Sequence, residues 1–205
     1  MGDEQEAVQT PCRQLSLFTF AHRILILSLC AVLASCATTR TAAPTRDASE
    51  LTAWRASGRI AVASPNGGGS GSFTWQQNGS QAAVNLRGPI GIGALRLTID
   101  GDELRIATGD GQEFESAAAR EELAARLGAT IPTQELRYWL VGVPAPGDHS
   151  WSEPAPDKAT VLTQQDWRIE YQRYETAGGY SLPTKLVATG GQARVRIVID
   201  KWKVE

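Results

Sequence analysis

The sequence predicts a mainly β fold, an antiparallel β-barrel or half-barrel of about ten to eleven strands with two helices plugging an apolar interior. Three observations support this prediction. Apolar and polar residues alternate with a period of two over much of the 205-residue chain, turn signals separate the alternating stretches, and one helical region interrupts them. An antiparallel sheet of this size must curl to be stable, and its concave side gives the helices an apolar surface to cover.

The N-terminal segment is expected to be a lipoprotein signal peptide rather than part of the fold. His22 and Arg23 precede an apolar run of about ten residues, which is shorter than the roughly twenty residues that a transmembrane helix needs. The run ends in Leu33-Ala34-Ser35-Cys36, which looks like a bacterial lipobox. We expect residues 1–35 to be removed and lipid to be attached to Cys36. The alternative is an ordinary secretory signal followed by a chance cysteine.

The residues after the cysteine are expected to connect the lipid to the folded domain. Residues 36–50 are small, polar and aperiodic, so they are predicted to form a lipidated N-terminus and a flexible tether. Ala37 stands where an aspartate tends to retain a Gram-negative lipoprotein at the inner membrane, which indicates the outer membrane instead. Cys36 is the only cysteine beyond the leader, so no intramolecular disulfide is expected. Residues 51–205 show neither a repeat nor a change of composition, and they are predicted to form a single domain.

The first half of this domain alternates in a way that is typical of antiparallel strands with one face in water. The alternating stretches are residues 54–62, 72–76, 84–87, 95–100 and 104–106. Glycine-containing turn signals lie between them, and Asn78-Gly79 and Asp100-Gly101 mark two tight hairpins.

The period changes in the middle of the domain, where two helices are predicted. Residues 116–127 consist of strong helix formers, with Ser116 as the candidate N-cap and Gly128 as the stop. A second helix is expected between Pro132, which is tolerated at a helix start, and Gly142, which ends it.

A Pro/Gly-rich loop is predicted at residues 142–158, long enough to be functional. It contains His149, the only histidine beyond the leader, which lies next to Asp148. No nucleophile accompanies this pair in a triad pattern, so a solvated loop histidine is the favoured interpretation. Strands resume in residues 167–172, in a shorter strand near 184–189, and in 194–200.

The composition and motifs argue against several classes of function. Lys+Arg total 20 and Asp+Glu 22, giving a net charge of −2, which is unlike the basic surface of a nucleic-acid binder. The basic residues of the last strand form either its solvent-exposed face or an edge to which a partner docks. No His/Cys cluster has metal-ligand spacing, and neither glycine-rich segment, 67–71 or 88–93, fits a nucleotide loop. We therefore expect a protein without catalytic residues, metal or cofactor, one that is not an enzyme.

Two apolar features suggest a function in handling hydrophobic ligands. The six tryptophans fall mostly on the apolar phase, where they either pack a filled core or line a hollow one. Ile90 lies in the turn Gly88-Pro89-Ile90-Gly91. An apolar side chain is costly at a turn tip, so Ile90 either folds back onto the sheet or contacts lipid.

Taken in chain order, these segments resemble the LolB family of outer-membrane lipoprotein receptors. The corresponding segments are the lipobox and residues 54–62, 70–75, 88–91, 136–144, 185–186 and 194–197. They span residues 54–202, and their order is more specific than any single segment. The family's exposed loop residue is typically leucine, and Ile90 keeps its apolar character.

The resemblance implies a half-open β-barrel with a helical lid over an apolar cavity. Such a protein accepts acylated lipoproteins from a LolA-like periplasmic carrier and inserts them into the inner leaflet of the outer membrane. It would work as a monomer on the periplasmic face, anchored by the lipid on Cys36, with Pro89, Ile90 and Gly91 as the membrane-insertion loop. Strand phase and helical spacing give the expected lining of the acyl cavity: Ile60, Phe73, Trp75, Leu86, Leu95, Leu97, Ile106, Leu136, Trp139, Leu140, Trp167, Ile169, Tyr171, Val195 and Ile197.

Two other classes of function remain open at this point. An outer-membrane lipoprotein that scaffolds the envelope, or binds a hydrophobic ligand without transferring it, would share the leader and the fold. A lipid-anchored hydrolase would depend on His149 and would need a nucleophile that the sequence does not display.

Overall fold

The computed structural model describes residues 46–88, 93–152 and 159–205. Cys36 and the predicted insertion loop, Pro89, Ile90 and Gly91, lie outside the described residues. The strands before the helices are β1 (Ala53–Ser64), β2 (Gly67–Asn78), β3 (Gln81–Arg87), β4 (Ala94–Asp100), β5 (Glu103–Thr108) and β6 (Glu113–Glu115). Those after the helices are β7 (Ser150–Trp151), β8 (Thr160–Gln164), β9 (Trp167–Ala177), β10 (Tyr180–Gly190) and β11 (Ala193–Val204).

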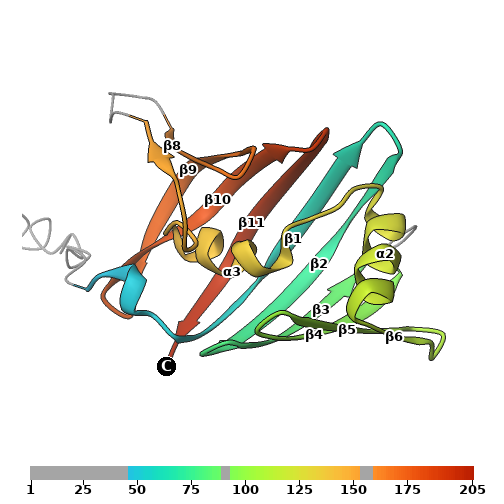
Figure 1. Ribbon diagram of the computed structural model, residues 1–205. Helices are drawn as coiled ribbons and strands as arrows, with labels where there is room; N and C mark the ends of the chain where they lie inside the picture. The colour runs from blue at the N-terminus through green and yellow to red at the C-terminus, as the bar shows by residue number, and fades with distance from the viewer. Residues whose placement is uncertain (1–45, 89–92, 153–158) are drawn as a thin grey trace, which may run out of the picture. The chain divides into compact units, whose positions relative to one another are not determined.

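The eleven described strands form one antiparallel sheet in the order β6-β5-β4-β3-β2-β1-β11-β10-β9-β8-β7. Except for β6 and β7, neighbours in the chain are neighbours in the sheet, and the last strand pairs with the first, so β1 and β11 lie at its centre (Figure 1). The sheet ends at β6 on one side and β7 on the other, and these edges do not pair with each other. The predicted half-open antiparallel barrel is confirmed.

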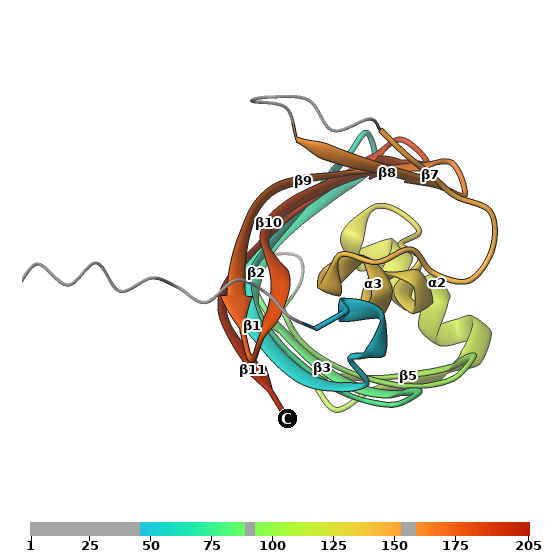
Figure 2. The same ribbon diagram turned by 90° about the vertical axis from the view of Figure 1, so that its left-hand side faces the viewer.

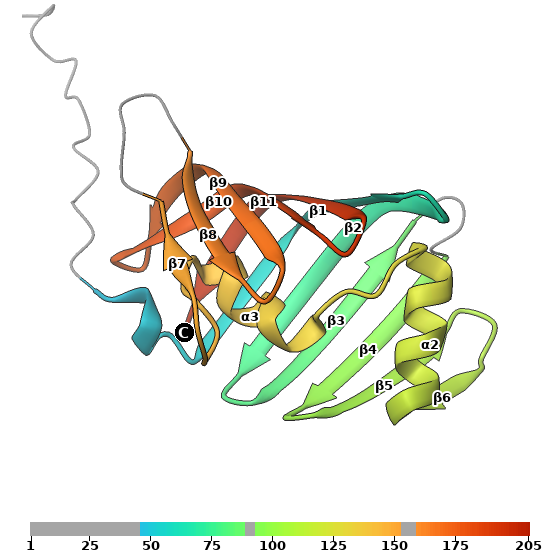
Figure 3. The ribbon, with the colours of Figure 1, turned by 45° about the horizontal axis from the view of Figure 1, so that its top comes forward.

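The two helices lie on the concave side of the curled sheet. They are α2 (Ser116–Leu127) and α3 (Thr133–Val141), which the chain inserts between the two edge strands. Figure 2 shows the sheet curving around both helices. In Figure 3, α2 lies over β5 and β6, while α3 lies nearer the C-terminal strands. The helices thus cover the apolar face that the open sheet would otherwise expose.

The period-two pattern places the apolar residues of each strand on the concave face. In β4, for example, Leu95, Leu97 and Ile99 are buried while their neighbours are exposed. Side chains directly opposite across an antiparallel ladder pack together, and Leu97 is opposite Val84 of β3 and Ile106 of β5. Such rows run across several strands and make the inner face of the sheet continuously apolar.

A β-bulge lies where β1 and β11 meet. The pairing shifts between Ser57 and Gly58, and a β-carbon on Gly58 would lie 2.0 Å from the carbonyl oxygen of Val198. Only glycine allows the two backbones to come this close. Ser57 pairs with Lys201 and Gly58 with Ile199, so Asp200 is the extra residue of the bulge. Asp200 and Lys201 are therefore both exposed, and Asp200 forms an ion pair with Arg59 at 3.1 Å.

The helices have the predicted bounds, with one correction at the first. Ser116 is the first residue of α2 rather than its N-cap; Glu115 holds the cap position, and no side chain caps the helix there. Gly128 ends α2 in the left-handed conformation at φ 72°, as expected. Gly142 ends α3 at φ 82°, and its N–H donates to the carbonyl of Trp139.

Three further details differ from the sequence expectations. The strand expected near residues 184–189 is β10, which extends over Tyr180–Gly190. The Pro/Gly-rich loop contains the short strand β7, which pairs with β8. Residues 46–50, assigned to the tether, contact the domain: Arg46 forms a bridge with Tyr180, and the 3₁₀ turn η1 (Ala48–Glu50) is capped by Asp47. Within the described ranges, no helix is long and apolar enough to cross a membrane.

Candidate functional site

An apolar cavity of about 50 Å³ lies between the concave face of the sheet and the two helices. Its walls come from β1 to β4, from β11, from both helices and from the segment that joins them. The lining residues are Ile60, Val62, Phe73, Trp75, Val84, Leu86, Leu97, Ile99, Leu123, Leu127, Ile131, Thr133, Leu136, Leu140, Val195 and Ile197. Such a surface suits a hydrocarbon ligand and offers almost nothing to a polar one.

The strand pairing explains why these side chains meet. Trp75 is opposite Val84, and Val84 is opposite Leu97, so one inward row crosses β2, β3 and β4. Ile60 of β1 is opposite Ile197 of β11 on one side and Gly71 of β2 on the other. A β-carbon on Gly71 would lie 2.3 Å from the carbonyl oxygen of Arg87, so only glycine fits there and the inward row has no side chain beside Ile60.

The cavity is too small for an acyl chain in this conformation. An apolar cavity of about 150 Å³ holds one benzene molecule, and the 50 Å³ here is a third of that. Leu123, Leu127, Leu136 and Leu140 of the helices are each at most 7% exposed. The space beneath the helices is therefore too small for a chain-length ligand, which requires at least one helix to move away from the sheet.

The helix α3 is fixed by buried hydrogen bonds. The indole N–H of Trp139 donates to Oε1 of Gln164 at 3.0 Å. The same oxygen accepts the backbone N–H of Ala145 at 2.9 Å, and Nε2 of Gln164 donates to the carbonyl of Ala145 at 2.8 Å. Gln164 is only 2% exposed, so this network attaches α3 and the residues after it firmly to β8.

The helix α2 is held by more peripheral contacts. It buries Ala119, Leu123 and Leu127, and the hydroxyl of Ser64 donates to the carbonyl of Gly128 at its end, at 2.7 Å.

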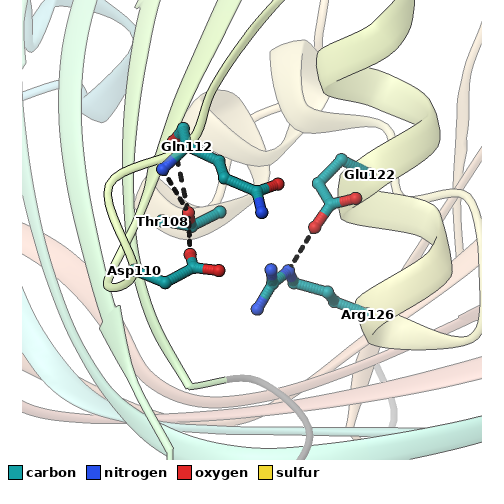
Figure 4. A network of polar contacts seen from close by, with 5 residues as sticks. All are labelled: Thr108, Asp110, Gln112, Glu122 and Arg126. Atoms are coloured by element: carbon teal, nitrogen blue, oxygen red, sulfur yellow. Dashed lines mark hydrogen bonds and ion pairs between the residues drawn. The ribbon is translucent and has the colours of Figure 1, made fainter.

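On the outer side of α2, Arg126 pairs with Glu122 at 2.5 Å and faces the turn between β5 and β6 (Figure 4). In that turn the Thr108 hydroxyl donates to Asp110, and this bond, a backbone N–H and the charge of Arg126 lower the pKa of Asp110 from 3.8. Because Asp110 is exposed, this interaction adds little to the hold on α2.

Nine of the predicted lining residues lie on the cavity wall: Ile60, Phe73, Trp75, Leu86, Leu97, Leu136, Leu140, Val195 and Ile197. The other six are buried elsewhere in the core: Leu95, Ile106, Trp139, Trp167, Ile169 and Tyr171. The prediction missed Val62, Val84 and Ile99, although they share the strand phase of residues that it included. It also missed Leu123 and Leu127, whose i, i+4 spacing marks the inner face of α2, and Ile131 and Thr133, which no sequence pattern marks.

Most tryptophans pack the core rather than line the cavity. Trp54 stacks on Trp75 with ring centroids 5.9 Å apart and contacts Trp202 edge-on at 5.3 Å. Of the six, only Trp75 borders the cavity, and only Trp151 is substantially exposed.

Two aromatic rings are exposed near the β7 edge of the sheet. Trp151 and Tyr174 are 40% and 41% exposed and flank the buried Tyr171, each with a centroid separation of 5.9 Å from it. Burial raises the pKa of Tyr171 well above its ordinary value of 10.0, and its hydroxyl has no partner among the described residues. His149 is exposed, and its ring nitrogen lies 3.1 Å from the carbonyl of Gly147 in its own loop.

Comparison with known proteins gives matches over nearly the whole domain. The family model described as outer membrane lipoprotein LolB matches residues 52–202. The outer-membrane lipoprotein LolB of Ectopseudomonas mendocina is 31% identical over 196 residues, covering 89% of this chain and 96% of the relative. That of Pseudomonas aeruginosa is 32% identical over 200 residues, covering 93% and 97%. A solved LolA superfamily protein from Nitrosomonas europaea aligns with a TM-score of 0.45 at 11% identity, over 76% of this chain and 87% of its own.

Proposed function

The chain belongs to the LolB family of outer-membrane lipoproteins, and on that premise we propose that it is a receptor for acylated lipoproteins. It takes them from a LolA-like periplasmic carrier and inserts them into the inner leaflet of the outer membrane. It acts without catalysis, and the lipid on Cys36 holds it at the periplasmic face.

The observation that carries this proposal is the cavity with apolar walls under two helices. Each methylene of an acyl chain gains about 0.8 kcal/mol on leaving water, so a chain of about fifteen methylenes gains about 12 kcal/mol. A lipid-modified protein therefore needs an apolar compartment at every step of its passage through water. A scaffolding protein has no use for a cavity that is lined in this way and covered by two helices.

Opening of the cavity is proposed to occur mainly through α2. Its hold on the sheet consists of three buried side chains, one hydrogen bond at its end and exposed polar contacts. The hold on α3 includes the buried network around Gln164. Because the buried network is the more costly to break, α2 lifts first and α3 remains as the fixed wall.

Transfer runs downhill in affinity, from carrier to receptor to bilayer, since no nucleotide motif is present to supply energy. Ile90 acts at the last step, where its apolar side chain enters the bilayer and helps the chains leave the cavity. The variant Ile90→Glu should accept lipoproteins from the carrier normally and incorporate them into membranes slowly. Incorporation at the normal rate would show that this role of Ile90 is wrong.

A transfer assay tests the proposal as a whole. Residues 37–205 are made as a soluble protein and mixed with a carrier that holds a labelled lipoprotein. Movement of the lipoprotein to this protein is expected, and it would also show that the lipid on Cys36 is not needed for receiving. If nothing moves although the protein is folded and the carrier passes its load to another receptor, the scaffolding function replaces the one proposed here.

A further inference from the structure

A second pocket, of about 320 Å³, lies against a different face of α3 from the one that lines the apolar cavity. Leu136 and Leu140 of α3 face the cavity, whereas Arg137, Tyr138 and Val141 face this pocket. Its other walls are η1, the start of β1 and the turn between β2 and β3. Figure 2 shows η1 beside α3, and residues of both elements line the pocket. The proposed acyl transfer makes no use of this pocket.

Arg137 is a half-buried cation for which the described part of the chain supplies no counter-charge. Among the described residues it forms no ion pair, and its Nε is buried without a hydrogen-bond partner. No acidic side chain of the described residues lines the pocket. A guanidinium that is partly removed from water and left unpaired is costly. The pocket is therefore built around a positive charge that an anion would neutralise.

The guanidinium is also held in position. Nη2 of Arg137 donates to the hydroxyl of Tyr138 at 2.7 Å, and its central carbon lies 4.6 Å from the centroid of the same ring. Stacking on an aromatic ring orients the planar fork in advance, so less side-chain entropy is lost when a ligand binds.

The rest of the pocket suits a ligand with both polar oxygens and carbon. Ser49 and Thr52 bring hydroxyl groups to its wall, while Leu51 and Val143 bring apolar surface. Planar guanidinium groups match the oxygens of phosphate in a two-point geometry, and hydroxyls complete such sites.

We propose that this pocket binds a ligand that carries a phosphate group, with Arg137 as the residue that contacts the phosphate. Two sources share this chemistry: the headgroup of a phospholipid, and free phosphate. Because α3 contributes to both sites, the bound ligand contacts the helix that forms the fixed wall of the apolar cavity.

Calorimetric titration of the full-length chain in a neutral detergent tests the proposal. The probes are inorganic phosphate and glycerophosphoglycerol, the water-soluble headgroup of phosphatidylglycerol, with glycerol as the uncharged control. Binding of at least one phosphate probe, and none of glycerol, is expected. Tighter binding of glycerophosphoglycerol identifies a lipid headgroup as the source, and tighter binding of inorganic phosphate identifies the free ion. Absence of binding by both probes at millimolar concentration would overturn the proposal.

Variants assign the binding to Arg137. We expect Arg137→Gln to weaken binding at least tenfold. Arg137→Lys keeps the charge but loses the planar N–H donors of the guanidinium, so it should weaken binding less. Arg194→Gln makes the same change of charge at an exposed residue that does not line the pocket, and it should leave the affinity within twofold of the wild type. Unchanged binding by Arg137→Gln would overturn the proposal.

A second substitution avoids any effect on the packing of α3. Ser49 is exposed on the wall of the pocket, so Ser49→Glu introduces a competing carboxylate without disturbing the core. It should reduce binding of either phosphate probe at least tenfold while the thermal midpoint stays within about 2 °C of the wild type. Normal phosphate affinity in this folded variant would also refute the site.

Discussion

Adding a methylene group at Val84 tests whether the space under the helices is a real void. Val84 is 3% exposed and faces the 50 Å³ cavity from the middle of the inward row on β3. The variant Val84→Ile keeps a β-branched side chain suited to a strand and extends it by one carbon toward the cavity. The sign of the change in stability then reports how the space is packed.

The expected effect follows from the burial of one methylene. If the cavity accepts it, the free energy of unfolding rises by about 0.8 kcal/mol. In a domain of this size such a gain raises the thermal midpoint by about 2–3 °C. If the interior is already filled, overpacking lowers the free energy of unfolding by about 1–3 kcal/mol instead.

Urea unfolding followed by tryptophan fluorescence distinguishes the two results. The matched control is Val187→Ile, because Val187 is 2% exposed and lines no part of the cavity; it should show no gain. A loss of more than 1 kcal/mol in Val84→Ile, or equal effects in both variants, would refute the inference that a void lies beneath the lid.

Three further predictions concern the fold that holds the cavity. Gln164→Leu leaves the indole N–H of Trp139 and both backbone groups of Ala145 buried without partners, so urea unfolding should show a loss of about 3 kcal/mol or more. The exposed Gln172→Leu is its control, and similar values for both would contradict the role of the network. Gly58→Ala places a β-carbon 2.0 Å from a carbonyl oxygen and should lower stability by about 3 kcal/mol or more; a wild-type midpoint in a thermal scan would rule this out. Burial raises the pKa of the Tyr171 hydroxyl above its ordinary value of 10.0, so as the pH rises this hydroxyl ionises in the unfolded chain before it does so in the folded protein. The contribution of Tyr171 to the stability of the folded protein is therefore complete below pH 10 and declines as the pH rises further. Urea midpoints at pH 8 and pH 11 should therefore fall less in Tyr171→Phe than in the wild type, and equal declines would contradict the assignment.

The sequence by itself determined which residues point inward and where the chain turns. Period-two alternation is a local property of an extended backbone, so Leu95, Leu97 and Ile99 could be assigned to the inner face without knowing their partners. Turn and helix-stop positions are local as well, because Gly79, Gly101 and Gly128 adopt positive φ angles that other residues rarely adopt. The segments of the resemblance lie in order along the same chain, so the family was also recognisable before the fold.

The tertiary structure alone decided which inward residues border the cavity and which are packed in the core. Trp139 and Leu140 are adjacent on α3 and equally buried, yet only Leu140 faces the cavity. The difference arises because Trp139 is drawn toward Gln164, a residue distant in sequence. The pocket around Arg137 is likewise not predictable from sequence patterns, since it depends on η1 and the β2–β3 turn meeting α3. Local periodicity fixes the direction of a side chain, whereas long-range packing determines what that side chain meets.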